Sequence, residues 1–149
     1  MFIEKVFKAG IADINTGELK LFQYNPEKFK DDRNVIYSSL TIPGLYSTRD
    51  QFVSGGSTTI SFELFLNAIN HQKGGQGILD DIIWLRSKTF PIRSDNILKV
   101  APPKVMLIWP GLYNVKGILT TCNIEHTAFF PDGKSKYCNI SIEIKKEYS

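Results

Sequence analysis

One pattern limits the possible folds of this chain more than any other, and it lies in the last third, from Val105 to Tyr148. Strand-forming residues from Leu112 to Phe130 are followed by a tight turn and a second long strand. Apolar and polar residues alternate in the returning strand, with Cys138, Ile140, Ile142 and Ile144 on one side and Asn139, Ser141, Glu143 and Lys145 on the other. A period of two places the two sets on opposite faces. We therefore predict a long hairpin whose dry face is covered by the rest of the chain or by another copy.

The turn of this hairpin has the composition of a sharp reversal. Pro131 fixes φ, Asp132 can bond to nearby backbone, and Gly133 accepts a positive φ. Phe129 and Phe130 come directly before the turn, so at least one of them must point outward. An exposed aromatic at a hairpin tip is either a local clasp or a contact with a partner, and the sequence leaves both open.

Size and charge exclude several classes of protein. A chain of 149 residues is expected to form one domain, 1–149, that is large enough for a hydrophobic core. The net charge of +3 and the scattered lysines and arginines do not indicate a nucleic-acid-binding protein. Neither a signal peptide at Met1 nor an apolar run of membrane-spanning length is present, so synthesis in the cytoplasm without membrane insertion is expected.

The remaining strands are expected from alternation and turn residues. They cover Phe2–Ala12, Leu19–Tyr24, Arg33–Thr41, Ser57–Asn67 and Lys104–Trp109. Between the third and fourth of these strands we expect a loop through Pro43-Gly44, with a sharp bend at Gly55-Gly56. A polar linker is expected from Ile92 to Ala101.

The sequence contains one convincing helix, from Gln76 to Lys88. Its apolar stripe is formed by Ile78, Ile82 and Leu85 and is widened by Leu79 and Ile83. Asp80 and Asp81 are expected in the first turn and Arg86 and Lys88 in the last, as the helix dipole favours. The glycines from Gly74 to Gly77 are interpreted as a flexible hinge. The predicted class is mainly β with one helix, as a β-barrel or two-sheet sandwich.

The sequence offers no evident chemistry. Cys122 and His126 would share a strand face but lie about 13 Å apart, too far to bind one metal ion. Adjacent carboxylates at Asp31-Asp32 and Asp80-Asp81 diverge and do not form an acid–base pair. We therefore expect no catalytic residue, metal or cofactor, and no enzymatic activity.

The two cysteines, Cys122 and Cys138, are expected to be half-buried free thiols on the two arms of the last hairpin. Counting outward from the turn places Cys138 opposite Ile124 or His126. A disulfide is the alternative, but nothing marks the chain as exported.

Several short motifs, in order along nearly the whole chain, resemble one family. They are Phe22-Gln23-Tyr24-Asn25-Pro26-Glu27-Lys28-Phe29, Pro43-Gly44-Leu45, Gln51-Phe52-Val53-Ser54-Gly55-Gly56, Thr58-Thr59-Ile60-Ser61-Phe62-Glu63-Leu64-Phe65, Pro102-Pro103 and Phe129-Phe130-Pro131-Asp132-Gly133. The chain resembles the tube proteins of contractile injection systems, which are similar to phage tail-tube proteins. Many members carry a LysM module after this domain, and the present sequence stops at Ser149 without one.

The resemblance implies a structural subunit of a phage tail, tailocin or related injection particle. Such subunits form rings, usually sixfold, as inner tube or tube-to-baseplate adaptor, and their neighbours are tail tube, hub or spike, and baseplate or sheath proteins. Together with the alternation, this predicts that Asn139, Ser141, Glu143 and Lys145 face the channel, with the helix outside. The predicted contacts between subunits are Phe129, Phe130, Asp132 and Lys134 at the hairpin tip.

A second interpretation remains at this point. The chain could be a small monomeric β-sandwich that binds a ligand or carbohydrate, with Trp84, Tyr113 or Phe129 as a stacking platform. The two interpretations differ in oligomeric state, since such a sandwich stays monomeric.

Overall fold

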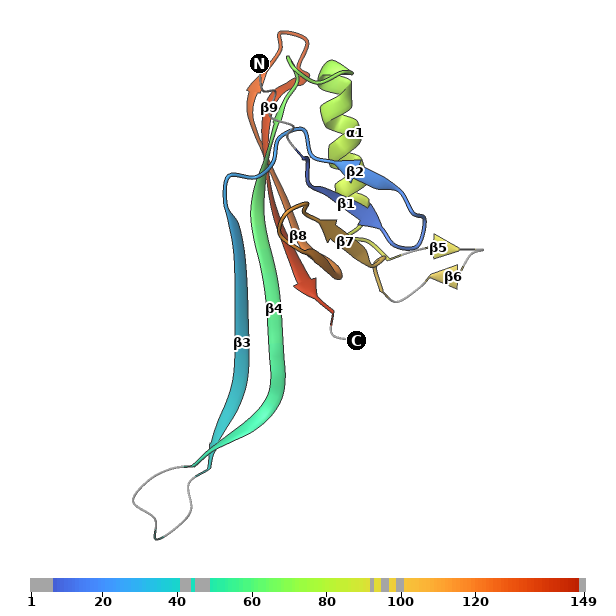
Figure 1. Cartoon of the computed structure of the whole chain (residues 1–149). Coiled ribbons are helices and arrows are strands. Elements are labelled where there is room, and N and C mark those ends of the chain that lie inside the picture. The colour runs from blue at the N-terminus through green and yellow to red at the C-terminus, as the bar shows by residue number, and fades with distance from the viewer. Residues whose placement is uncertain are drawn as a thin grey trace.

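The computed structural model of the chain consists mainly of β-strands. It describes residues 7–40, 44, 49–91, 93–94, 97–98 and 101–147. The elements within these residues are β1 (Gly10–Asp13), β2 (Leu19–Leu21), β3 (Phe29–Leu40), β4 (Arg49–Asn67), α1 (Gly74–Ser87), β5 (Arg93–Ser94), β6 (Ile97–Leu98), β7 (Val105–Ile108), β8 (Asn114–Phe129) and β9 (Ser135–Lys146). Figure 1 shows the helix beside one end of the sheet and the β3–β4 hairpin running away from the other. The predicted class, mainly β with one helix, is confirmed.

Seven of the strands form one antiparallel sheet. Its order is β2-β1-β7-β8-β9-β4-β3, and β5 and β6 form a separate two-stranded ladder within the stretch expected to be a polar linker. Within the described residues the sheet does not close into a barrel, so β2 and β3 are its edges. The long C-terminal hairpin lies in the middle of the sheet, between β7 and β4.

The core lies on one face of this sheet and is built from direct cross-strand pairs. Apolar residues of β4 face those of β9 in four pairs: Ile60 and Ile144, Phe62 and Ile142, Leu64 and Ile140, Leu66 and Cys138. All of these side chains are buried, as the helix side chains Ile78, Ile82 and Leu85 are. The predicted dry face of the returning strand is therefore confirmed, and α1 packs against it. The predicted register is also confirmed, because Cys138 pairs with His126.

The start of the helix differs from the prediction. The helix begins at Gly74, so the glycines interpreted as a hinge form its first turn, and that turn contains no acidic residue. The dipole argument for Asp80 and Asp81 is therefore wrong. Gly77 is required for a different reason, since a Cβ at this position would lie 2.1 Å from the ring of His71.

The outer side of the helix also departs from the prediction. Leu79 and Ile83, expected to widen the buried stripe, are exposed by 47% and 58%. The sheet reaches only the stripe of Ile78, Ile82 and Leu85, because a helix lying on a flat face buries only one side of its surface.

The strands of the front half have other bounds than the alternation indicates. β1 is confined to Gly10–Asp13 and β2 to Leu19–Leu21, while Phe2–Val6, Ile42-Pro43 and residues 45–48 lie outside the described residues. β4 begins at Arg49, so the stretch up to Gly56 that was expected to be a loop is a strand. Gly56 has φ of +73° opposite a register shift in β3, so it forms a bulge within a ladder rather than ending one.

Three polar contacts fasten the β1–β2 hairpin to α1. Lys88 donates to Asp13 across 2.7 Å in a buried ion pair. The indole of Trp84 donates to Glu18 at 2.8 Å, and Lys20 pairs with Asp81 at 3.0 Å. Burial raises the pKa of Asp13, but the hydrogen bond from Lys88, backbone N–H groups and the Lys88 charge outweigh it, and the pKa lies below its ordinary value.

Phe22 and the Asn25-Pro26 pair, in the segment after β2, each have a structural role. The Phe22 side chain is buried against Phe62. The amide of Asn25 accepts from the N–H of Ala9 and donates to the carbonyl of Phe7. This side chain thus makes the two bonds that a neighbouring strand would make, at a place where Pro26 has no N–H to offer.

Candidate functional site

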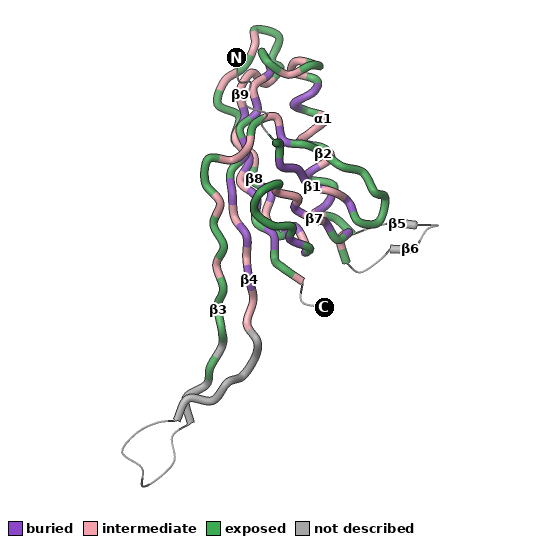
Figure 2. The backbone as a smooth tube through the Cα atoms, in the orientation of Figure 1, coloured by how far each residue is buried: buried purple, intermediate pink, exposed green. Residues whose placement is uncertain are grey.

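The outer half of the β3–β4 hairpin has no other strand beside it among the described residues. β4 pairs with β9 only from Thr59 to Asn67, whereas its pairing with β3 continues to Arg49. The outer half of the hairpin is thus a ribbon of two strands, and Figure 1 shows it extending well beyond the body. Two strands alone are marginally stable in water. We call residues 33–40 and 49–58 the ribbon; Figure 2 shows its β3 arm exposed up to the residues drawn in grey.

The base of the ribbon is held to the body by the loop between β7 and β8. Tyr113 donates a hydrogen bond to Asp31, which raises the pKa of Tyr113 to about 12. The Phe29 ring is roughly perpendicular to the rings of Trp109 and Tyr113, and its centroid lies 5.0 and 5.8 Å from theirs. Trp109 packs against the core while remaining partly exposed. These contacts fix the direction in which the ribbon leaves the sheet.

The four residues predicted to face a channel lie on the sheet face opposite to the helix. This follows from alternation, since their neighbours Cys138, Ile140, Ile142 and Ile144 form the buried face. On this polar face Ser141 Oγ donates to Glu63 at 3.4 Å, and Thr121 Oγ1 donates to Glu143 at 3.2 Å. Asn139, Ser141, Glu143 and Lys145 thus form one row along this face.

The tip of the β8–β9 hairpin carries the four residues predicted to contact a neighbouring subunit. Phe129 is 60% exposed and lies 5.9 Å from the ring of His126, whereas Phe130 packs against the core. Asp132 and Lys134 are exposed, and the Asp132 carboxylate accepts from the N–H of Lys134. One aromatic therefore points outward and one inward, as the sequence required, and the outward one has a contact within its own arm.

The structure contains a groove that the sequence did not predict. Its volume is about 750 Å³, and it lies between the segment 24–28 and β4, with Asn139 of β9 at its side. The segment is tied to β4 at both ends, because the Gln23 amide bonds to the backbone N–H and carbonyl of Asn67, and Phe29 pairs with Phe62. Between these ties the chain bows away from β4. No sequence signal marks this, since each tie is a long-range contact.

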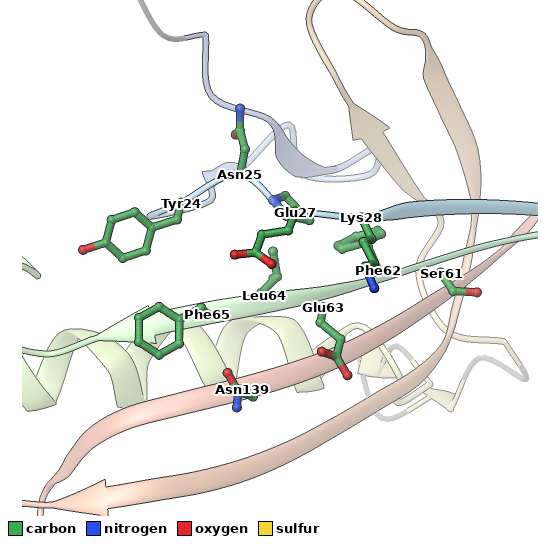
Figure 3. Close-up of a pocket in the computed structure, with 11 residues that line it drawn as sticks. Tyr24, Asn25, Glu27, Lys28, Ser61, Phe62, Glu63, Leu64, Phe65 and Asn139 are labelled. Carbon is green, nitrogen blue, oxygen red and sulfur yellow. The ribbon is translucent and has the colours of Figure 1, made fainter.

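Figure 3 shows the side chains that line this groove. Tyr24 and Phe65 lie at one end with their rings stacked 6.0 Å apart. Glu27 extends from the segment towards β4, and Glu63 lies on the side of Asn139. A smaller hollow of about 390 Å³ adjoins it and shares Glu63 and Asn139.

The histidines and cysteines of the chain do not line either hollow. His71 contacts Asp81 at 3.0 Å, and His126 contacts Ser135 at 2.8 Å. Cys122 and Cys138 are free and buried, and burial raises the pKa of both thiols, that of Cys138 to about 11. In the part of the chain that the structure describes, no three His, Cys, Asp or Glu side chains are placed to hold a metal ion. No helix in that part is long and apolar enough to cross a membrane.

The three aromatic residues considered as a ligand platform lie in different surroundings. Trp84 bonds to Glu18 and has the ammonium of Lys88 over its ring at 4.6 Å. The Tyr113 hydroxyl is bonded to Asp31. Phe129 projects from the hairpin tip. Trp84 and Tyr113 are thus held by polar contacts within the chain, and Phe129 has a ring contact with His126.

Comparisons with known proteins point in one direction. The family model described as "contractile injection system tube protein" matches residues 6–149. Among solved structures, a chain in the tail of an empty gene transfer agent particle, refined with helical and C6 symmetry, matches with a TM-score of 0.50 and 11% sequence identity. That match covers 95% of this chain and 91% of the other, and at this identity it shows a shared fold. The comparison with curated proteins gave no match.

Proposed function

We propose that this chain, which belongs to the contractile injection system tube protein family and is thus a structural subunit of a tail or tail-like particle, closes with its own copies into a ring around a channel. The observation that carries this proposal is the ribbon. Among the described residues its strands pair only with each other, and an isolated pair of strands gains stability when another surface covers it. A neighbouring copy supplies such a surface.

Six copies are the proposed ring order. The tail particle that shares the fold has C6 symmetry. Within the described residues the sheet has two different open edges, β2 and β3. Contacts between unlike surfaces of identical subunits are heterologous, and they produce closed rings when the rotation per subunit divides a full turn.

The proposed orientation places the polar face of β9 towards the channel and α1 outside. Its support is that the row of Asn139, Ser141, Glu143 and Lys145 and the helix lie on opposite faces of one sheet. An apolar lining of Ile140, Ile142 and Ile144 would require the core to open. The proposed role is mechanical rather than catalytic. The proposed partners are further tube rings, hub or spike proteins, and baseplate or sheath proteins.

The test is electron microscopy of purified particles that contain this chain, with a map that resolves side chains. The expected result is a sixfold ring in which the ribbon lies on a neighbouring subunit and the Ser141 face lines the channel. The chain is expected to be made in the bacterial cytoplasm and then found in the particle. A solitary subunit whose ribbon contacts only its own body contradicts the proposal, and a channel lined by Ile142 contradicts the orientation alone.

A further inference from the structure

The groove beside β4 is lined by backbone groups without a partner strand. Both the N–H and the carbonyl of Asn67 bond to the Gln23 side chain and hence point away from β9, whereas the N–H of Ala68 points to β9 and bonds to Lys136. Backbone direction alternates along an antiparallel strand. The N–H and carbonyl groups of Glu63 and Phe65 therefore also point away from β9, into the space between β4 and the bowed segment, where no described strand pairs with them.

The walls of the groove favour a cation with an apolar stem. Glu27 and Glu63 contribute two carboxylates and Lys28 one ammonium, which leaves one negative charge in excess. No ion pair joins these three side chains to one another among the described contacts. The stacked rings of Tyr24 and Phe65 supply an apolar end. A lysine would place its methylenes on the rings and its ammonium among carboxylate and carbonyl oxygens.

The tip of the β8–β9 hairpin has the complementary chemistry. It extends past the end of β4, since the last pair between β4 and β9 is Asn67 with Tyr137, followed by one hydrogen bond from the N–H of Ala68 to the carbonyl of Lys136. It presents Phe129 together with the exposed Lys134, and the described ion pairs do not include the Lys134 ammonium. The tip and the groove lie at the same end of the sheet, because Lys134 and Asn139 are separated by only five positions along the chain, about 16 Å at the rise of a strand.

We propose that the groove beside β4 receives the β8–β9 tip of a second copy, with Lys134 bound by Glu27 and Glu63 and Phe129 packed against Tyr24 and Phe65. This inference rests on the proposed ring and names one of its contacts. The contact is heterologous, since tip and groove are different surfaces, and it can therefore be repeated from subunit to subunit around a ring. It is separate from the ribbon, which leaves the opposite end of the sheet.

Cysteine cross-linking of the full-length chain tests the contact directly. The double-cysteine variant carries Glu63→Cys and Lys134→Cys on one chain, and the native Cys122 and Cys138 remain because both are buried. A disulfide requires Cα atoms no more than about 7 Å apart. After mild oxidation we expect a ladder of covalent oligomers in non-reducing electrophoresis that ends in a closed ring. Wild type and the variant with Glu63→Cys alone are the controls and should give no ladder.

A charge exchange gives an independent measurement. Glu63→Lys and Lys134→Glu should each weaken self-association by about fivefold per contact, and the double variant should recover most of the loss, since the pair is restored in reverse. Lys145→Glu is the control, because this exposed residue lies at the far end of β9 and lines neither hollow, and it should change association much less.

The outcomes separate this contact from the ring itself. Rings in the microscope, without a covalent ladder from the double-cysteine variant, overturn the inference and leave the proposed function standing. A double charge variant that associates no better than either single variant also overturns it. If neither rings nor cross-links form with the chain in its assembled particle, both the contact and the proposed function are wrong.

Discussion

The two long hairpins of this protein have similar lengths, but one lies in the middle of the sheet and the other projects from its edge. The β8–β9 hairpin has a strand on either side and a helix on its apolar face. The β3–β4 hairpin has a neighbouring strand, β9, only along the base of β4, and the described residues of its outer half pair only with each other. Length alone therefore does not reveal what a hairpin is for. Most of the first hairpin forms the interior of the subunit, whereas we propose that the outer half of the second is covered by a neighbouring copy.

The largest expected effect comes from the supported hairpin. Ile142→Ala removes a fully buried side chain that pairs with Phe62 and Cys122. We expect the free energy of unfolding to fall by about 4 kcal/mol, because the cavity adds to the lost burial. Urea unfolding followed by circular dichroism measures this. Ser141→Ala, the neighbour on the polar face, is the matched control and should cost less than about 1 kcal/mol.

The next largest effect tests whether the body depends on its buried ion pair. Asp13→Asn leaves the ammonium of Lys88 buried without its counter-charge, and we expect a loss of about 3 kcal/mol in unfolding free energy. The ribbon should be unaffected. The double variant with Lys88→Met has no buried charge left unpaired, so it should lose less unfolding free energy than Asp13→Asn alone. An equal loss in the two variants would show that the unpaired ammonium is not the cause.

The same pair predicts a pH dependence. The pKa of Asp13 is lower in the folded chain than in the unfolded one. Its contribution is therefore complete above the ordinary pKa of about 3.9 and is lost as the pH falls through the lower folded value. Unfolding measured between pH 5 and pH 2 should show a steeper loss of stability for wild type than for Asp13→Asn. Parallel curves would contradict this.

A smaller effect on stability is expected at the bulge of the ribbon. Gly56→Ala places a Cβ 1.6 Å from the Asn34 carbonyl oxygen, so the ribbon must shift. We expect a loss of about 2 kcal/mol or less, together with loss of rings. Gly17→Ala is the control, because Gly17 also has positive φ but an added Cβ meets no atom within 4 Å. Normal rings with Gly56→Ala would show that the shape of the ribbon is unimportant.

The smallest effect on stability is expected on the ribbon surface. Tyr37 is 60% exposed, so Tyr37→Ser should change the unfolding free energy by no more than about 0.5 kcal/mol. Ring formation should nevertheless weaken, because an exposed aromatic ring is a frequent anchor between subunits. Sedimentation velocity at several concentrations measures this. If stability falls while assembly is unchanged, the distinction between the two hairpins is wrong.

The parts that could be predicted are those with a strong local pattern. The alternation from Cys138 to Ile144 predicted the buried face, and the turn at Pro131–Gly133 predicted the register that pairs Cys138 with His126. The parts that were missed depend on distant partners. The helix start was misplaced because the role of Gly77 depends on the ring of His71, and the groove depends on the tie between Gln23 and Asn67.

The strand periods, the central hairpin and the resemblance to tube proteins are encoded in the order of neighbouring residues, and they could therefore be inferred before any fold was known. Which hairpin is enclosed and which one projects depends on how distant strands meet in space. β4 is long enough to pair with β9 along one part and to continue beyond it along another, and no residue in β4 marks where its second neighbour stops. That limit is set by the end of the returning strand at Lys146, which lies far along the chain and pairs with β4 only after folding.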